Sequence, residues 1–293
     1  DISKMRSMTY PERAAYIICL FLTDFTNDEL KEYTAAAYSK SRFGDIPAPV
    51  IDIGGESILE LFHGPTSAFK DFALQLLPYL LTASAKKQGI NDKIAILVAT
   101  SGDTGKAALE GFADVDGTGI CVFYPYGGTS EIQRLQMTTQ QGKNVLVTAV
   151  KGNFDDAQSG VKAIFTDKAY TDELKEMGIR LSSANSINWG RLVPQVAYYF
   201  SAYCDMANAG AVKFGDEINI AVPTGNFGNI LAAYIAKLCG LPVKRFICAS
   251  NKNNVLTDFI QSGTYDKNRP FYLTTSPSMD ILISSNLERL LYL

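Results

Sequence analysis

A lysine at the start of an apolar helix pattern is the first residue that could do chemistry. Lys70 lies between Phe69 and Phe72, shortly after the turn-forming pair Gly64-Pro65. Burial disfavours the ammonium form and lowers the pKa of a lysine, and Schiff-base chemistry with a carbonyl compound requires the neutral amine. The alternative is a lysine whose stem lies along a helix and whose ammonium group reaches water. For one lysine considered alone this alternative is favoured, so loops elsewhere in the chain must decide.

Two glycine-containing loops, each between an apolar strand pattern and a helix pattern, could bind anions. They are Pro223-Thr224-Gly225-Asn226-Phe227-Gly228-Asn229 and Thr100-Ser101-Gly102-Asp103-Thr104-Gly105. Glycine lets backbone N–H groups approach an anion, and a helix N-terminus adds free N–H groups and a favourable potential. A tight turn that needs glycine for its dihedral angles is the alternative for each loop. The second loop is not a nucleotide-binding loop, because the spacing of its two glycines is too short.

Polar side chains also precede a long apolar helix pattern that starts near Trp189. Asn185 and Asn188 could contact a ligand, or they could cap the helix, which asparagine does well. Arg191 could pair with a substrate phosphate, or it could be an ordinary residue of the first helical turn. The residues alone leave both questions open.

Composition excludes several classes of function. The 293-residue chain has a net charge of −3 and no basic run, which argues against a nucleic-acid partner. His63 is the single histidine, so the sequence predicts neither a histidine-based zinc site nor a Ser-His-Asp triad elsewhere in the chain, and no metal. The early apolar run 14–22 is too short to span a membrane. The five cysteines form no CxxC pair and indicate reduced core residues of a cytoplasmic protein.

The elements that must position these residues alternate between strand and helix patterns. The strands are expected at 50–53 and 57–62, as a hairpin, and then at 94–99, 120–124, 145–150, 179–182, 218–222 and 245–249. Helices are expected from Pro11, and at 29–39, 70–88, 104–113, 130–141, 155–168, 189–209, 228–239 and 254–261. This alternation predicts an α/β fold, with parallel or mixed sheets covered by helices.

Four of these stretches resemble, in the same order, the threonine synthase family of fold-type-II pyridoxal-phosphate enzymes, which are tryptophan synthase beta-like. They are His63-Gly64-Pro65-Thr66-Ser67-Ala68-Phe69-Lys70-Asp71-Phe72, the loops at 100–105 and 223–229, and Ala184-Asn185-Ser186-Ile187-Asn188. The resemblance implies two domains with the cofactor between them. The larger would consist of 1–91 and 182–293, and the smaller of 92–181.

The resemblance also implies roles for single residues. Lys70 would be the catalytic lysine that forms the Schiff base with pyridoxal phosphate. The cofactor phosphate would be bound by Gly225, Asn226, Phe227, Gly228 and Asn229, and the ring oxygen by Asn185 or Asn188. The substrate would be faced by Thr66, Ser101, Gly102, Asp103, Thr104 and Arg191. Many relatives carry asparagine in place of Asp103, where it contacts the ring's 3′ oxygen, and a carboxylate cannot play that part unchanged.

The implied activity is that of a lyase converting O-phospho-L-homoserine and water to L-threonine and phosphate, in a cytoplasmic monomer or homodimer. One alternative is a serine or threonine dehydratase. Another is a threonine-synthase-like protein that binds cofactor and a phosphorylated ligand without turnover. Family members continue beyond the stretch 276–290, and the polar partner of the pyridine nitrogen lies in that part. We therefore expect the chain to be a piece of a longer protein.

Overall fold

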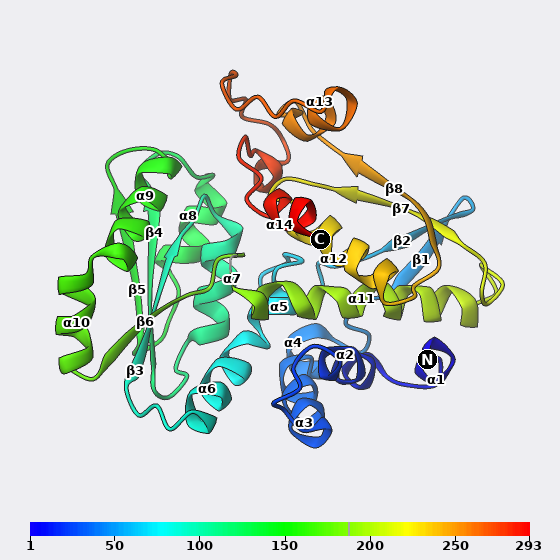
Figure 1. Cartoon of the computed structure of the whole chain (residues 1–293), viewed down its shortest axis with the longest axis horizontal. Helices are drawn as coiled ribbons and strands as arrows, with labels where there is room; N and C mark the ends of the chain where they lie inside the picture. Colours follow the sequence, from blue (N-terminus) through cyan, green and yellow to red (C-terminus); the bar gives the residue numbers. More distant parts are fainter. Residues whose placement is uncertain (187) are drawn as a thin grey trace.

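Four parallel strands form the larger sheet of the computed structural model, which describes residues 1–186 and 188–293 (Figure 1). Ile187, within the fourth of the resembling stretches, lies outside the described residues. The strand order is β5-β4-β3-β6, with bounds β3 (Lys93–Ala99), β4 (Thr118–Pro125), β5 (Val145–Val150) and β6 (Ile179–Ser183). Helices on both faces bury β3, which explains its nearly continuous apolar sequence.

The side chains of β3 alternate between two helical layers. Ile96 and Val98 pack with α7 (Asp103–Phe112) and α8 (Glu131–Thr138) on one face. Leu97 and Ala99 pack with α9 (Phe154–Thr166) on the other face. Because α7 starts directly after β3, residues 100–103 lie at the carboxyl edge of the sheet, where open α/β folds bind ligands.

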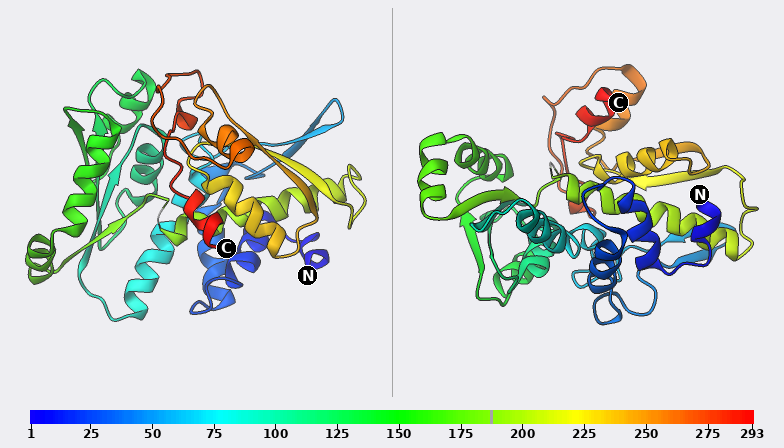
Figure 2. Two further views of the ribbon diagram at one scale, coloured as in Figure 1. Left: turned by 45° about the horizontal axis from the view of Figure 1, so that its top comes forward. Right: turned by 60° about the horizontal axis from the view of Figure 1, so that its bottom comes forward.

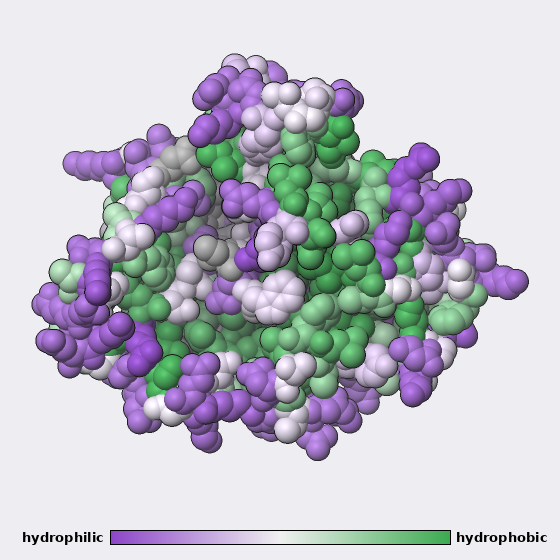
Figure 3. Space-filling view, in the orientation of Figure 1, coloured by the Kyte–Doolittle hydropathy of each residue, from purple (hydrophilic) through white to green (hydrophobic). Residues whose placement is uncertain are grey.

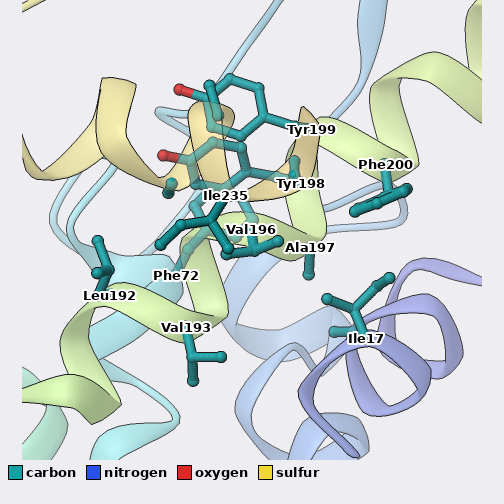
Figure 4. Packing of buried hydrophobic residues seen from close by; sticks show 14 of the residues in the cluster. Ile17, Phe72, Leu192, Val193, Val196, Ala197, Tyr198, Tyr199, Phe200 and Ile235 are labelled. Atoms are coloured by element: carbon teal, nitrogen blue, oxygen red, sulfur yellow. The ribbon is translucent and has the colours of Figure 1, made fainter. Parts of the chain in front are cut away.

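The largest core surrounds α11 (Trp189–Asn208), a long helix that crosses the molecule. It packs against α2 (Tyr10–Cys19), α5 (Asp71–Leu74) and α12 (Gly228–Leu238). Figure 4 shows Phe72 of α5 beside Tyr198, and Ile17 of α2 on another side of the helix. Lys70 is thus only two residues from Phe72, which packs at the centre of this core.

The second parallel pair is β7 (Ile218–Pro223) with β8 (Val243–Ala249), and an antiparallel hairpin joins β1 (Val50–Ile53) to β2 (Glu56–Leu59). The remaining helices are α1 (Ile2–Met5), α3 (Asn27–Ala37), α4 (Lys40–Phe43), α6 (Leu77–Lys87), α10 (Lys168–Glu176), α13 (Val255–Ser262), η1 (Pro277–Met279) and α14 (Leu287–Tyr292). In the left view of Figure 2, the segment leading to α14 lies between the two parallel sheets.

The structure confirms the α/β fold class and the strand pattern. Among the helices, the short α1, α4, η1 and α14 were not predicted, and two longer segments also differ. The helix expected at 70–88 divides into α5 and α6, because Pro78 has no N–H group to donate to the Leu74 carbonyl oxygen. The helix α10 was not predicted. It starts at the cap Asp167, is rich in polar residues and buries none of them. The division into a larger domain and a smaller domain at 92–181 stays a prediction. The strands of the four-stranded sheet lie within residues 93–183.

Apolar side chains also gather on the surface near the C-terminal helix (Figure 3). Trp189, Leu238 and Tyr292 line an open groove of about 530 Å³ between α11, α12 and α14. None of the groove's lining residues is a predicted site residue. Among the described residues, no helix combines the length and the hydropathy needed to cross a membrane.

Substitution by alanine should have opposite effects on stability at two glycines, because their surroundings differ. A Cβ atom at Gly111 would lie 2.1 Å from the carbonyl oxygen of Leu74, whereas one at Gly160 would meet nothing within 4 Å. We expect Gly111→Ala to lower the free energy of unfolding by about 1–3 kcal/mol, because backbone must move. Gly160→Ala should raise it by about 0.5–1 kcal/mol, since alanine is favoured within a helix. Urea denaturation measures both, and equal midpoints would contradict the close packing of α7 on α5.

Candidate functional site

The backbone before Lys70 is held by the fully buried carboxylate of Asp71. Its two oxygens accept hydrogen bonds from the Thr66 backbone N–H at 2.8 Å and from the Thr66 hydroxyl at 2.7 Å. Gly64 packs so closely here that a Cβ atom would lie 2.6 Å from the Asp71 side chain. Burial raises the pKa of Asp71, while the hydrogen bonds from Thr66 and Ala68 oppose that shift. Thr66, predicted to face the substrate, therefore has its hydroxyl engaged in shaping this turn.

Lys70 itself lies in a largely enclosed position at the start of α5. Its side chain is 12% exposed, with Nζ 3.4 Å from Oδ2 of Asp103 and 5.1 Å from the centre of the Phe69 ring. Burial lowers the pKa of Lys70, Asp103 opposes this shift, and the nearby Arg191 adds to it. The amine is therefore deprotonated more readily than that of an exposed lysine, as its apolar sequence context suggested.

The loop after β3 places Asp103 beside Lys70, as the N-terminal residue of α7. The N–H groups of Gly102 and Gly105 donate to the Thr100 hydroxyl, at 3.0 and 2.9 Å. Gly102 therefore does not offer its N–H group to a ligand. Ser101 is exposed, and Thr104 is half-buried in the first turn of α7.

The loop after β7 has the features of an anion site. Phe227 is buried in the left-handed region, with φ +65°, and α12 begins at the next residue. The carbonyl oxygens of Gly225 and Asn226 accept hydrogen bonds from Ser284 Oγ at 2.5 Å and Asn286 Nδ2 at 3.0 Å. Among the described residues, no acceptor pairs with the backbone N–H groups of 225–228. A loop with engaged carbonyl groups and free N–H groups fits a phosphate.

The side chain of Asn229 stabilises the end of the same loop through hydrogen bonds to the loop's own backbone. Asn229, predicted to bind the cofactor phosphate, donates from Nδ2 to the Pro223 carbonyl oxygen at 2.8 Å, and its Oδ1 accepts from the Ile230 N–H at 2.9 Å. The side chain of Asn229 thus closes the turn, and the free N–H groups lie before it.

The two predicted asparagines before α11 both contact the surrounding backbone. Asn185 Nδ2 donates to the Ala99 carbonyl oxygen at 3.1 Å. Asn188 caps α11 by accepting from the Gly190 N–H at 2.9 Å, and its Nδ2 donates to the Ser183 carbonyl oxygen at 3.0 Å. The helix-capping interpretation thus describes Asn188, while each amide group keeps a second N–H that could reach a ligand.

Arg191 is a buried cation with an unused donor. Its side chain is 5% exposed and donates from Nη1 to the Ala184 carbonyl oxygen. Among the described residues, its buried Nε has no hydrogen-bond partner. Burial lowers the pKa of Arg191 to about 10, so the group remains cationic at neutral pH. A buried guanidinium with a free N–H favours a nearby anion.

Hydrogen bonds join the four predicted loops into one site. Asn226 Nδ2 donates to the Ser186 hydroxyl at 2.8 Å, which links the loop after β7 to the loop before α11. Ser278 donates to Asp103, and a Cβ atom at Gly225 would lie 3.0 Å from Cα of the adjacent Met279. The short helix η1 therefore connects the Lys70–Asp103 pair with the anion loop.

Several residues of this site had no role in the sequence analysis. They are Gln133, which contacts Asp103, and five residues of the C-terminal segment: Ser278, Asp280, Ser284, Ser285 and Asn286. The stretch 276–290 resembles the family in sequence. However, the contacts of Ser278, Ser284, Ser285 and Asn286 join residues more than 50 positions apart, which no local pattern indicates.

A buried lysine and a free anion loop, placed between parallel sheets, define an α/β enzyme of the fold-type-II class. The sequence model described as pyridoxal-phosphate dependent enzyme matches residues 58–290, and the chain belongs to this family. Pyridoxal phosphate is therefore its cofactor. The free N–H groups of 225–228 and the amine of Lys70 fit the two groups by which this compound is bound, a phosphate and an aldehyde.

Proteins similar to this chain include threonine synthases and proteins named Threonine synthase-like 1. The chain is 47% identical over 295 residues to Threonine synthase-like 1 of Homo sapiens, covering 97% of this chain and 39% of the relative. It is 48% identical over 252 residues to threonine synthase of Pseudomonas aeruginosa, covering 85% and 50%. The crystal structure of PLP-bound threonine synthase from Brucella melitensis matches with a TM-score of 0.88 at 41% identity, covering 99% and 60%. The chain thus spans between 39% and 60% of these relatives.

The protonation of Lys70 can be measured directly. Because burial lowers its pKa, the amine should be neutral, and reactive, at lower pH than the amine of the exposed Lys213. Pulsed reductive methylation of the whole protein without cofactor, followed by peptide mass spectrometry, gives the pH at half-maximal rate for each lysine. A midpoint for Lys70 at or above that of Lys213 would contradict the enclosed position described here.

Proposed function

We propose that this chain is the cofactor-binding part of a threonine synthase, a carbon–oxygen lyase that acts on phosphates. The reaction converts O-phospho-L-homoserine and water to L-threonine and phosphate. The observation that carries the proposal is the enclosed Lys70 amine beside Asp103, in a chain 48% identical over 252 residues to the Pseudomonas aeruginosa threonine synthase.

Each of two loops would hold one part of the cofactor. Pyridoxal phosphate, when bound, supplies an electron sink that stabilises negative charge on the substrate carbon next to the amino group. The free N–H groups of Gly225, Asn226, Phe227 and Gly228 would bind its phosphate, with Asn229 closing the turn. The second N–H of the Asn185 or Asn188 amide would reach its ring oxygen.

Lys70 is the base in this proposal. A neutral Nζ can accept a proton from the α-carbon of the substrate and, after it has released that proton, one from the β-carbon. Asp103, 3.4 Å away, would pair with the ammonium group that results. Phosphate leaves from the γ-carbon and water adds at the β-carbon, so the lysine both removes and returns protons.

The substrate carries two anions, which need separate donors. The N–H groups of Ser101 and Thr104, for which the described residues provide no acceptor, suit its carboxylate. The free Nε of Arg191 suits its phosphate. Gly102 contributes through its missing side chain, since a Cβ atom there would meet Gln133. Thr66 would act through the turn that it forms with Asp71.

Two other functions use the same site. A serine or threonine dehydratase would need the lysine and one anion loop, but no donor for a second phosphate. The unused Nε of the buried Arg191 favours the threonine synthase reaction over this one. A protein that binds a phosphorylated ligand without turnover is the second candidate, because the identity to Threonine synthase-like 1 is nearly equal to that for the named enzyme, at 47% and 48%. We further propose a cytoplasmic monomer or homodimer.

Removal of the lysine tests the enzyme proposal. In the whole protein with pyridoxal phosphate, we expect a visible absorption band that borohydride abolishes, and turnover of O-phosphohomoserine to threonine. Lys70→Ala should lack the band and lose turnover by at least ~1000-fold. A band without turnover in the wild type would favour the ligand-binding alternative. Faster reaction with free serine than with O-phosphohomoserine would favour the dehydratase.

Arg191 provides a test of the second phosphate. Arg191→Met removes the buried cation at similar length, and kcat/KM for O-phosphohomoserine should fall roughly 10- to 100-fold, because a charge-assisted hydrogen bond is lost. Reaction with free serine should change little, and it serves as the control for folding. An equal loss with both substrates would show that Arg191 acts through the backbone at Ala184 or through the pKa of Lys70.

A further inference from the structure

Among the described residues, the carboxylate of Asp103 has three partners, and Lys70 is the most distant of them. Oδ1 accepts from Gln133 Nε2 at 2.6 Å. Oδ2 accepts from the hydroxyl of Ser278 and lies 3.4 Å from Lys70 Nζ. A strong ammonium–carboxylate hydrogen bond measures about 2.7–2.9 Å. The ion pair between Lys70 and Asp103 is therefore long, and the carboxylate oxygen involved also accepts a hydrogen bond from Ser278.

Gln133 fixes the orientation of this carboxylate. Its side chain is 8% exposed, and its Oε1 accepts from Ser130 at 3.2 Å. The amide group lies in space that a side chain at Gly102 would occupy, since a Cβ atom there would lie 2.3 Å from Gln133 Cδ. Rotation of the Asp103 carboxylate toward Lys70 would break the hydrogen bond at 2.6 Å.

Ser278 is held in place independently of Asp103. Asp280, two residues further, accepts from Asn251 Nδ2 at 2.8 Å, from the Thr274 hydroxyl at 2.7 Å and from the Thr274 N–H at 2.9 Å. These contacts fix the turn around η1, so Ser278 presents its hydroxyl to Oδ2 without depending on the lysine.

We propose that Ser278 is a positioning residue that competes with Lys70 for one oxygen of Asp103, while Gln133 holds the other, so that the lysine is oriented without being locked in an ion pair. The inference rests on the proposed role of Lys70 as the cofactor lysine. The charged groups that face this amine are Asp103 from α7, Asp71 from α5 and Arg191 from α11. Of these, Asp103 is the carboxylate that pairs with Lys70, and it also accepts from Ser278, whereas Asp71 accepts from Thr66.

The consequence concerns the supply of neutral amine. A hydrogen bond from Ser278 satisfies part of the Asp103 charge and weakens its hold on the ammonium form. Without that hydroxyl, Oδ2 would serve Lys70 alone, and the lysine would keep its proton to higher pH. The serine thus favours the protonation state that carbonyl chemistry requires.

Ser278→Ala tests the proposal in the whole protein without cofactor. At a fixed pH below the midpoint, reductive methylation of Lys70 should slow by roughly three- to tenfold, because less of the amine is neutral. Ser276→Ala is the matched control, since Ser276 is exposed in the same segment and contacts Asn251 and Thr274 but not Asp103. Ser276→Ala should leave the methylation rate of Lys70 unchanged. Ser278→Thr, which keeps a hydroxyl group, should give the wild-type rate.

A second background separates competition from simple loosening of the segment. In an Asp103→Asn protein there is no charge to share, so adding Ser278→Ala should have no further effect on the rate. An effect of equal size in both backgrounds, or a faster reaction in the single variant, overturns the proposal. Peptide mapping after borohydride reduction of the holoenzyme reports separately on the proposed function: an adduct on another lysine would overturn the role of Lys70 and leave the competition measurable.

Discussion

The site depends on one electrostatic balance, between the burial of the Lys70 amine and the attraction of Asp103. Burial lowers the pKa of the lysine and the carboxylate opposes that change. With burial alone, nothing would orient the amine, and with a short ion pair the amine would stay protonated. The separation of 3.4 Å lies between these limits. The surrounding loops can be understood as the parts that keep this distance fixed.

The fold supplies that precision by connecting the lysine to rigid elements on every side. Asp71 anchors the turn before Lys70, and Phe72 packs against Tyr198 in the core around α11. Asp103 begins a helix that follows directly on the central strand β3. Each functional side chain is thus within a few residues of a buried helix or strand, which limits its movement.

Sequence reasoning found the parts of the site that are local in the chain. Lys70, the loops near Asp103 and Gly225 and the capping residue Asn188 all follow from turns, glycines and helix starts, which depend on neighbouring residues. Strand order, and the contacts of Gln133 and Ser278, come from tertiary packing across long separations, which no periodicity records. The helix α10 was missed for a different reason: it is polar and buries no residue, so no apolar core face marks it.

The separation in sequence between Lys70 and Ser278 has a consequence for the time at which the lysine becomes reactive. During synthesis on the ribosome, Lys70 emerges about 200 residues before η1, which corresponds to roughly 10–40 s at ordinary elongation rates. In that interval the amine is in water, with the basicity of any free lysine, and almost entirely protonated at neutral pH. The contact between Ser278 and Asp103 forms only when the late-made C-terminal segment meets the early-made loop.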